Sequence, residues 1–173
     1  ILTADFTRPI TEGLAKEIGE VDYILHLGAE THVDNSIENP EPFVMSNVVG
    51  TMRLLDFART LPKLERFLYF STDEVYGDIE EGTHSEECLL KPSNPYSASK
   101  ASADQLILAW HKTYDVPYVI LRPTNNYGPG QYVEKLIPKT IKYLRLGRKV
   151  PLHNHGTPRR MWLHADDTAS AVM

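Results

Sequence analysis

The chain has 173 residues, of which 24% are charged and 42% hydrophobic, and its formal net charge is −5 at pH 7. This composition excludes a disordered or collagen-like chain, and no apolar run approaches the ~18 to 20 residues of a membrane span. The 18 Lys and Arg residues are scattered, so we expect no nucleic-acid partner. The single cysteine, Cys88, permits no disulfide within the chain and fits a reducing, cytoplasmic location.

Short apolar runs alternate with helical patterns along the chain. The apolar runs span residues 21–29, 66–71 and 118–121, and they are nearly continuous, as in strands buried on both faces of a parallel sheet. Helical patterns cover about 42–60, 95–114 and 134–147. In the first of these, a helical period links Val44, Val48, Leu55 and Ala58. We therefore predict an α/β fold, a Rossmann-like doubly wound parallel sheet joined by right-handed crossovers.

The two ends of the chain resemble the middle of structural elements. The chain opens as ILTADFT, which is typical of the end of a strand, and closes as HADDTASAVM, which is typical of the first turns of a helix. We therefore expect an internal piece of a longer protein. The segment from Pro151 to His164 is rich in His, Pro, Gly and Arg and is expected to be a loop that closes over a ligand.

Polar side chains cluster where each expected strand ends, at residues 28–32, 71–74 and 124–127. In open α/β sheets, ligands bind beyond the carboxyl ends of the strands, so all three clusters are expected at one edge. Polar strand ends that merely face solvent are the alternative explanation. Three successive clusters favour a binding site.

Tyr96 and Lys100 stand four residues apart near the start of an expected helix, which brings their side chains onto one face. A phenol with a pKa near 10 is a poor base at neutral pH, and a nearby ammonium favours the phenolate. The spacing is common by chance, but its place after the strand that ends in Ser71 and Thr72 adds weight to it.

Asp73 and Glu74 are adjacent carboxylic acids at the same strand end. In a regular strand they would face opposite ways, so sharing one substrate requires the backbone to leave the strand near Thr72. If they converge, repulsion between them favours one protonated acid and one ionised base. Such a pair suits elimination of water, and a solvated acidic turn is the alternative.

A resemblance to a known family rests on four segments: STDEVYG at 71–77, PYSASK at 95–100, NNYGP at 125–129 and EKLIP at 134–138. In this order they resemble the nucleotide-sugar 4,6-dehydratases of the extended short-chain dehydrogenase/reductase family. Asp73-Glu74 is the specific part, because related epimerases and decarboxylases share the Tyr-x-x-x-Lys pair but usually differ at Asp73. The resemblance implies that residues 1–125 form an N-terminally truncated NAD-binding core. It implies that residues 126–173 begin a small nucleotide-sugar-binding subdomain and return to the core.

The implied activity is that of a hydro-lyase that converts a nucleoside diphosphate-glucose to its 4-keto-6-deoxy sugar, with NAD as cofactor. Tyr96 would take the C4 hydroxyl proton while hydride passes from C4 to NAD, and Lys100 would lower the pKa of Tyr96 and hold the nicotinamide ribose. Thr72 would hydrogen-bond the C4 oxygen. Glu74 would remove the C5 proton and Asp73 would protonate the departing C6 hydroxyl. Hydride then returns to C6, so NAD is not consumed.

The resemblance also implies binding contacts. The expected cofactor contacts are Asp5, Phe6, Leu27, Gly28, Ala29, Ser46, Tyr96, Lys100 and Asn126. The expected substrate contacts are Thr31, Thr72, Asn125, Lys135, Leu136, Pro151, Leu152, His153 and Arg160. A guanidinium suits a diphosphate. Several of these residue types also suit structural roles, such as apolar core, helix cap or surface charge.

Other functions stay open. We expect dTDP-glucose as the first choice of substrate, and UDP-glucose is the alternative because His153 stands where dTDP-sugar enzymes generally carry a tyrosine. An epimerase or decarboxylase of the same family is a further alternative. The chain carries no G-x-x-G-x-x-G turn, so this piece alone is expected to be inactive, and a silent binding fragment is the non-enzyme alternative. Two histidines in one loop without a cysteine are weak evidence for metal, and we expect none.

Small residues occur on part of the surface of both crossover helices: Gly50, Ala98, Ala101, Ser102 and Ala103. They permit close approach of another helix, and in the resembling family the equivalent helices commonly build a homodimer. We therefore expect a homodimer through the segments 42–60 and 95–114. Packing of these residues against the sheet of their own chain is the alternative.

Overall fold

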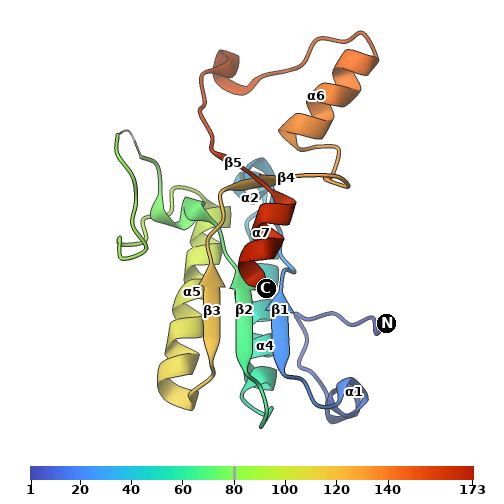
Figure 1. Ribbon diagram of the computed structural model, residues 1–173, viewed down its shortest axis with the longest axis vertical. Coiled ribbons are helices and arrows are strands. Elements are labelled where there is room, and N and C mark those ends of the chain that lie inside the picture. Colours follow the sequence, from blue (N-terminus) through green and yellow to red (C-terminus); the bar gives the residue numbers. More distant parts are fainter. Residues whose placement is uncertain (80) are drawn as a thin grey trace. The chain divides into compact units, whose positions relative to one another are not determined.

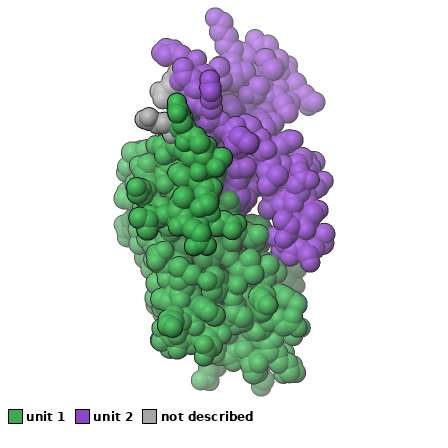
Figure 2. All heavy atoms as spheres, turned by 60° about the vertical axis from the view of Figure 1, so that its left-hand side comes forward, with its two compact units in different colours: residues 1–122 green, residues 123–173 purple. Residues whose placement is uncertain are grey.

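The computed structural model describes residues 1–79 and 81–173 and divides into two compact units. Unit 1 is Ile1–Arg122 and unit 2 is Pro123–Met173 (Figure 2). Unit 1 contains a three-stranded sheet and unit 2 contains a two-stranded one. The structural division falls just before residue 125, the end of the core expected from the sequence. The binding roles of the two parts remain predictions.

The sheet of unit 1 is parallel, with strand order β1 (Tyr23–His26), β2 (Arg66–Phe70) and β3 (Tyr118–Leu121). Tyr23 pairs with Arg66 and Phe67 pairs with Tyr118, so the carboxyl ends of all three strands lie at one edge. This confirms the predicted parallel α/β fold. The first strand is shorter than the apolar run 21–29, because residues 27–29 extend beyond its ladder with β2.

Helices connect these strands. The helices of unit 1 are α1 (Glu12–Ile18), α2 (Val33–Glu38), α3 (Glu41–Phe43), α4 (Thr51–Ala58) and α5 (Pro95–Tyr114), with the π-helix η1 (Val44–Gly50) and the 3-10 helix η2 (Asp73–Tyr76). The crossover from β1 to β2 runs through α3, η1 and α4, and the crossover from β2 to β3 runs through η2 and α5. The short helices α1 and α2 were not predicted, because neither extends over two full turns of an apolar pattern.

The π-helix η1 changes which residues of the first crossover are buried. The buried positions are Phe43, Asn47, Gly50, Thr51, Leu55 and Ala58, whereas 48% of Val44 is exposed. A π-helix has a wider turn than an α-helix, so an α-helical period extended from Leu55 back to Val44 assigns the wrong side. The predicted period is correct for Leu55 and Ala58 and wrong for Val44.

The main core lies between the sheet and one layer of helices. Leu55 and Ala58 of α4 and Ala103 and Ile107 of α5 pack with side chains of β2 that point to the same face. Figure 1 shows α4 and α5 on this face of the sheet. Burial of such apolar side chains contributes roughly 1.5 to 3 kcal/mol each, so this layer holds α5 firmly against the strand ends.

The small residues of the two crossover helices pack mostly inside unit 1. Ala101 and Ala103 are buried, and Gly50 is buried against the ring of Phe6. A Cβ atom on Gly50 would lie 2.4 Å from a Phe6 ring carbon, so a larger residue there would force the Phe6 ring to move. These three residues therefore do not form an outer surface. The alternative of packing against the sheet is confirmed for Ala103, whereas Ala101 packs against Val75 and Tyr76 of η2 and Gly50 against Phe6.

Unit 2 is built on a parallel pair of short strands. Its elements are β4 (Asn125–Tyr127), α6 (Leu136–Arg145), the 3-10 helix η3 (His153–Gly156), β5 (Trp162–His164) and α7 (Ala165–Val172). Asn125 pairs with Trp162 and Tyr127 with His164. The helix predicted at 134–147 and the terminal helix are confirmed. The predicted loop before His164 instead contains η3 and β5, because elements of four and three residues leave no periodic signal.

Residues 1–5 carry no regular secondary structure, so the strand end predicted there is wrong. The Asp5 carboxylate accepts hydrogen bonds from the amide and the hydroxyl of Thr7, and this side chain forms a turn instead. Across the described residues, 1–79 and 81–173, no helix has the length and apolarity that crossing a membrane requires.

His26 predicts how stability depends on pH. It is buried in the core of unit 1, where its Nε2 lies 3.0 Å from Thr51 Oγ1, and burial together with the Lys100 ammonium lowers its pKa to about 4. The unfolded histidine titrates near 6.5, so stability contributed by neutral His26 is present above that pH and is lost as the pH falls towards 4. We expect the free energy of unfolding of the complete protein to drop by about 2 kcal/mol between pH 7.5 and 5 because of this group.

Urea denaturation at a series of pH values measures this effect. A His26→Gln variant should lose that part of the pH dependence, whereas His111→Gln, at an exposed position on α5, should keep it. Identical slopes for the wild type and His26→Gln would contradict the assignment.

Candidate active site

The start of α5 is defined by its cap. The Asn94 side chain accepts a hydrogen bond from Ser97 N at 2.9 Å, and Ser97 Oγ accepts one from Asn94 N at 3.2 Å, which makes a reciprocal capping box. Pro95 occupies the first turn, where its missing N–H costs nothing. The helix therefore begins at a fixed residue, and this places Tyr96 in its first turn and Lys100 one turn later.

Tyr96 is held by hydrogen bonds of its backbone and by a contact of its ring. Its backbone N–H donates to Ser36 Oγ at 3.1 Å, and its carbonyl accepts from Ser99 Oγ at 2.7 Å. The ring of Phe43 stands edge-on, with 6.4 Å between the ring centroids. Tyr96 and Lys100 are both buried. The sequence placed these two residues on one helix face, and the structure adds that this face points inward.

The backbone leaves the strand at Thr72, as sharing of one substrate by Asp73 and Glu74 requires. Strand β2 ends at Phe70 and η2 begins at Asp73, with Thr72 as its cap. Thr72 Oγ1 accepts from Glu74 N at 3.3 Å and lies 3.3 Å from an Asp73 carboxylate oxygen, to which it donates. Both carboxyl groups are half-buried.

The two carboxyl groups come close to Tyr96. The Thr72 hydroxyl hydrogen-bonds the Tyr96 phenol, and the charges of Glu74 and Asp73 both act on it. In addition, Asn94 Nδ2 donates to Glu74 Oε2 across a long 3.5 Å contact, which joins the cap of α5 to the acidic pair. The structure thus brings together Thr72, Asp73, Glu74 and Tyr96.

Lys100 points at the end of β2. Its Nζ donates to the carbonyl oxygen of Phe70 at 2.6 Å and lies 4.1 Å from the centroid of the Tyr69 ring. Burial lowers the pKa of this ammonium to about 8, and the carboxylate of Asp104 works against that shift. Near neutral pH the group is therefore largely charged inside the protein.

The sequence predicts that Lys100 lowers the pKa of Tyr96, and this part of the prediction is wrong for the side chains as they are arranged. Burial first, and the Glu74 carboxylate second, raise the pKa of Tyr96 to about 12. The Lys100 ammonium is directed at the Phe70 carbonyl. Desolvation disfavours the phenolate, so further positive charge beside the ring is needed before Tyr96 acts as a base.

The loop after β1 is pinned by a residue that the sequence did not single out. Asn47 on η1 accepts from Glu30 N at 2.9 Å and donates to Glu30 O at 3.0 Å. Its amide also donates to Ser99 Oγ at 2.9 Å, on the same helix turn as Tyr96. Asn47 thereby connects the end of β1 to α5. A polar residue within the buried stripe of a helix was the available signal.

The cofactor contacts expected around β1 occupy different environments. Leu27 and Gly28 are exposed beyond the strand, and the Phe6 ring packs beneath Gly28, where a Cβ atom would lie 2.9 Å away. Ala29 is half-buried, Ser46 is half-buried on η1 and Asp5 is exposed. Thr31 is also exposed, and it has an interaction partner within the chain.

The chemistry of these groups fits a dinucleotide such as NAD. The exposed backbone beyond β1 lies at the sheet edge where phosphates and riboses bind in parallel α/β folds. The Lys100 ammonium suits ribose hydroxyls, and the buried Tyr96 phenol suits proton transfer next to a hydride acceptor. Among the described residues, no group of three or more His, Cys, Asp or Glu side chains could hold a metal ion.

The other expected contacts belong to unit 2. Asn126 binds its own unit, with Nδ2 donating to Thr124 O at 3.0 Å and Oδ1 accepting from Thr168 Oγ1, and Asn125 Nδ2 donates to Met161 O at 3.5 Å. The remaining contacts are Lys135, half-buried at the start of α6, and the exposed residues Leu136, Pro151, Leu152 and Arg160. The side chain of His153 lies outside the described residues. A shared substrate for these residues stays a prediction.

A parallel sheet with a phenol, an ammonium, a hydroxyl and two carboxyl groups beyond its carboxyl edge defines a Rossmann-fold protein of the dehydrogenase and dehydratase class. The chain belongs to the NAD dependent epimerase/dehydratase family, whose sequence profile matches residues 2–173. This agrees with the resemblance derived from the four sequence segments.

Comparison with individual proteins shows which members of the family this chain resembles. A dTDP-glucose 4,6-dehydratase of Streptomyces niveus is 48% identical over 151 residues, which cover 87% of this chain and 45% of the relative. The crystal structure of a dTDP-glucose 4,6-dehydratase from Streptomyces venezuelae with NAD bound matches with a TM-score of 0.91 and 42% identity, over 98% of this chain and 52% of that one. A UDP-glucuronic acid 4-epimerase from Bacillus cereus with UDP-glucuronic acid and NAD matches with a TM-score of 0.88 and 30% identity, over 98% and 54%. The chain thus spans about half the length of these relatives.

Substitutions of Asn94 test its role as the cap of α5. Serine caps a helix about as well as asparagine, whereas alanine costs about 1 kcal/mol. We therefore expect Asn94→Ala to lower the free energy of unfolding of the complete protein by about 1 kcal/mol, and Asn94→Ser to leave it nearly unchanged. Chemical denaturation measures both variants, and equal losses in the two would contradict the capping assignment.

Proposed function

We propose that the complete protein removes water from a nucleoside diphosphate-glucose, with NAD as cofactor, to form the 4-keto-6-deoxy sugar. The observation that carries this proposal is the Asp73-Glu74 pair. It follows Thr72 on η2, and, in addition to burial, the charges of both carboxylates raise the pKa of Tyr96. The relatives from two Streptomyces species, both dTDP-glucose 4,6-dehydratases, support it and make dTDP-glucose the first choice of substrate.

In the first half of the reaction, Tyr96 takes the proton of the C4 hydroxyl and Thr72 hydrogen-bonds the C4 oxygen. NAD, when bound, accepts a hydride and returns it within the same turnover. Burial raises the pKa of Tyr96 to about 12, and the positive charge of an oxidised nicotinamide beside the ring would favour its phenolate. The product of this half is a C4 ketone, which acidifies the neighbouring C5–H bond.

In the second half, Glu74 removes the C5 proton while Asp73 protonates the C6 oxygen. The C5–H and C6–O bonds break, a C5=C6 double bond forms and water leaves. Reduction at C6 and return of a proton to C5 then complete the 4-keto-6-deoxy sugar. This division of labour needs one ionised and one protonated carboxyl group.

Substrate recognition is proposed for residues of both units. Thr31 of unit 1 and Asn125, Lys135 and Arg160 of unit 2 supply polar and cationic groups for the sugar and the diphosphate. Apolar side chains of Leu136 and Leu152, with Pro151 and His153, complete the expected set. UDP-glucose is the alternative substrate, because an imidazole replaces the usual tyrosine at His153.

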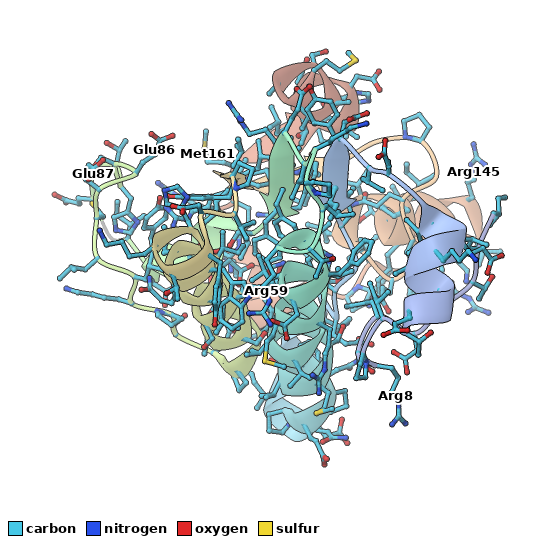
Figure 3. The ribbon with its side chains drawn as sticks, turned by 90° about the horizontal axis from the view of Figure 1, so that it is seen from below. Arg8, Arg59, Glu86, Glu87, Arg145 and Met161 are labelled. Carbon is cyan, nitrogen blue, oxygen red and sulfur yellow. The ribbon has the colours of Figure 1, made fainter. Side chains whose placement is uncertain are left out.

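We also propose that the protein is a cytoplasmic homodimer. Both crossover helices carry exposed apolar side chains: Val44 and Met45 on η1, and Leu108 and Tyr114 on α5. The guanidinium of Arg59, at the end of α4, lies 4.6 Å from the Tyr114 ring centroid, and Figure 3 shows α4 and α5 side by side near this residue. A second copy would remove these apolar groups from water.

The activity is tested by incubating the complete protein with dTDP-glucose and with UDP-glucose and detecting loss of water by mass spectrometry. We expect turnover of dTDP-glucose, and we expect Asp73→Asn to slow water loss about 10²-fold or more while C4 oxidation stays detectable as reduced cofactor. Asp78→Asn, at an exposed carboxylate on the same segment, is the matched control. Water loss by Asp73→Asn at the wild-type rate would exclude Asp73 as the acid.

The dimer is tested with Leu108→Glu on α5. A charge at this exposed apolar position would be buried by a partner helix, so we expect the variant to be monomeric in light scattering and the wild type to be dimeric. Thr113→Glu introduces the same charge at another exposed site of α5 and should remain dimeric. A monomeric wild type would contradict the proposal.

A further inference from the structure

Tyr76 closes the 3-10 helix η2 that carries Asp73 and Glu74, and an arginine binds its phenol. Arg122, the residue after β3, donates from Nη1 to the Tyr76 hydroxyl at 2.6 Å. The same guanidinium lies 5.1 Å from the centroid of the Tyr76 ring. Tyr76 is buried and Arg122 is half-buried, so this charged hydrogen bond is partly shielded from water.

The second anchor of Arg122 is on α5. Its Nε donates to Asp104 Oδ2 at 2.9 Å, and the Asp104 side chain is 0% exposed. Asp104 follows Lys100 by one helical turn and Tyr96 by two, on the buried face of the same helix. One guanidinium therefore ties η2, with the acidic pair, to α5, with the phenol and the ammonium.

Stability alone does not account for this cluster. A buried ion pair contributes little to stability compared with apolar side chains of similar size, because desolvation of the charges opposes their attraction. Burial raises the pKa of Asp104 even though Arg122 bonds it. The polar cluster keeps a defined geometry at some cost in desolvation.

We propose that Tyr76, Arg122 and Asp104 form a positioning clamp that holds Asp73 and Glu74 in register with Tyr96 and Lys100. This inference rests on the proposed dehydration, and it assigns roles to three residues that are not among the expected substrate and cofactor contacts. The planar guanidinium suits the task, because it bonds two partners in fixed directions at once. Apolar packing of Val75 and Tyr76 against Ala101 of α5, and the Lys91 amide, which donates to Val75 O at 2.9 Å, also hold η2.

Loss of the clamp should affect the two halves of the reaction differently. C4 oxidation depends mainly on Tyr96 and Lys100 of α5, with Thr72 at the junction of β2 and η2, whereas removal of the C5 proton and of the C6 hydroxyl depends on η2. Loosening the clamp shifts η2 relative to the sugar and leaves α5 in place against the core. A displacement of about 1 Å in a reacting group costs up to about 10²-fold in rate, so elimination is the step that should suffer.

Two variants of the complete protein test the clamp. Tyr76→Phe removes only the hydroxyl that Arg122 binds, and Arg122→Lys keeps the charge but cannot bond both partners as a fork. Tyr118→Phe is the matched control, because Tyr118 lies half-buried on β3 against the His111 ring and away from η2. Single-turnover experiments with dTDP-glucose follow cofactor reduction and water loss separately, and substrate deuterated at C5 reports when proton removal limits the rate.

We expect both variants to oxidise C4 at close to the wild-type rate and to lose water roughly tenfold or more slowly, with a larger isotope effect from C5 deuterium. Without any ligand, hydrogen exchange of the peptide 71–77 should become several-fold faster, while exchange of 95–104 should be unchanged. Tyr118→Phe should match the wild type in both measurements.

Two results would overturn the clamp. If Tyr76→Phe and Arg122→Lys slow oxidation and elimination by the same factor, or slow neither, the three residues have a structural role only. Unchanged exchange of 71–77 would lead to the same conclusion even if a variant were poorly active. If the wild type itself removes no water from either nucleotide sugar, the proposed function fails, and this outcome is distinct because it needs no variant.

Discussion

A buried ammonium at the carboxyl end of the sheet sets the arrangement of unit 1. Lys100 is 2% exposed, and its charge depends on the Phe70 carbonyl at 2.6 Å, the Tyr69 ring and the carboxylate of Asp104. Because a buried ammonium without an acceptor is very costly, α5 must lie where the last carbonyl of β2 is within reach. The same position brings Tyr96 next to Thr72.

Helix α5 therefore has two different halves. Its first half buries polar side chains, among them Ser97, Ser99 and Lys100, which bind backbone or neighbouring side chains. Its second half buries Ala103 and Ile107 in the apolar core between the helices and the sheet. Packing of the apolar half holds the helix in place, so the reactive side chains on the polar half keep defined positions. Sites on rigid elements keep their geometry better than sites on loops.

Much of this could be predicted from the sequence, where a local signal was strong. The strands at 66–71 and 118–121 and the helix at 95–114 follow from apolar runs and from a helical pattern. The prediction failed for Val44, because a π-helix shifts the period, and for β5, which has only three residues. Asn47 and Arg122 were not singled out, since their partners are distant in sequence and a residue alone does not reveal its contacts.

The sequence by itself determined which chemical groups are present and how they are spaced: a phenol four residues before an ammonium, and two acids directly after a hydroxyl. It also determined the parallel α/β fold and, through its motifs, the family. Only the tertiary structure decided that the pKa of Tyr96 is raised, because the phenol is buried. Only the tertiary structure decided, too, that Arg122 joins Asp104 to Tyr76. Both depend on how much water remains around a group and on which distant residues surround it, and these are properties of packing.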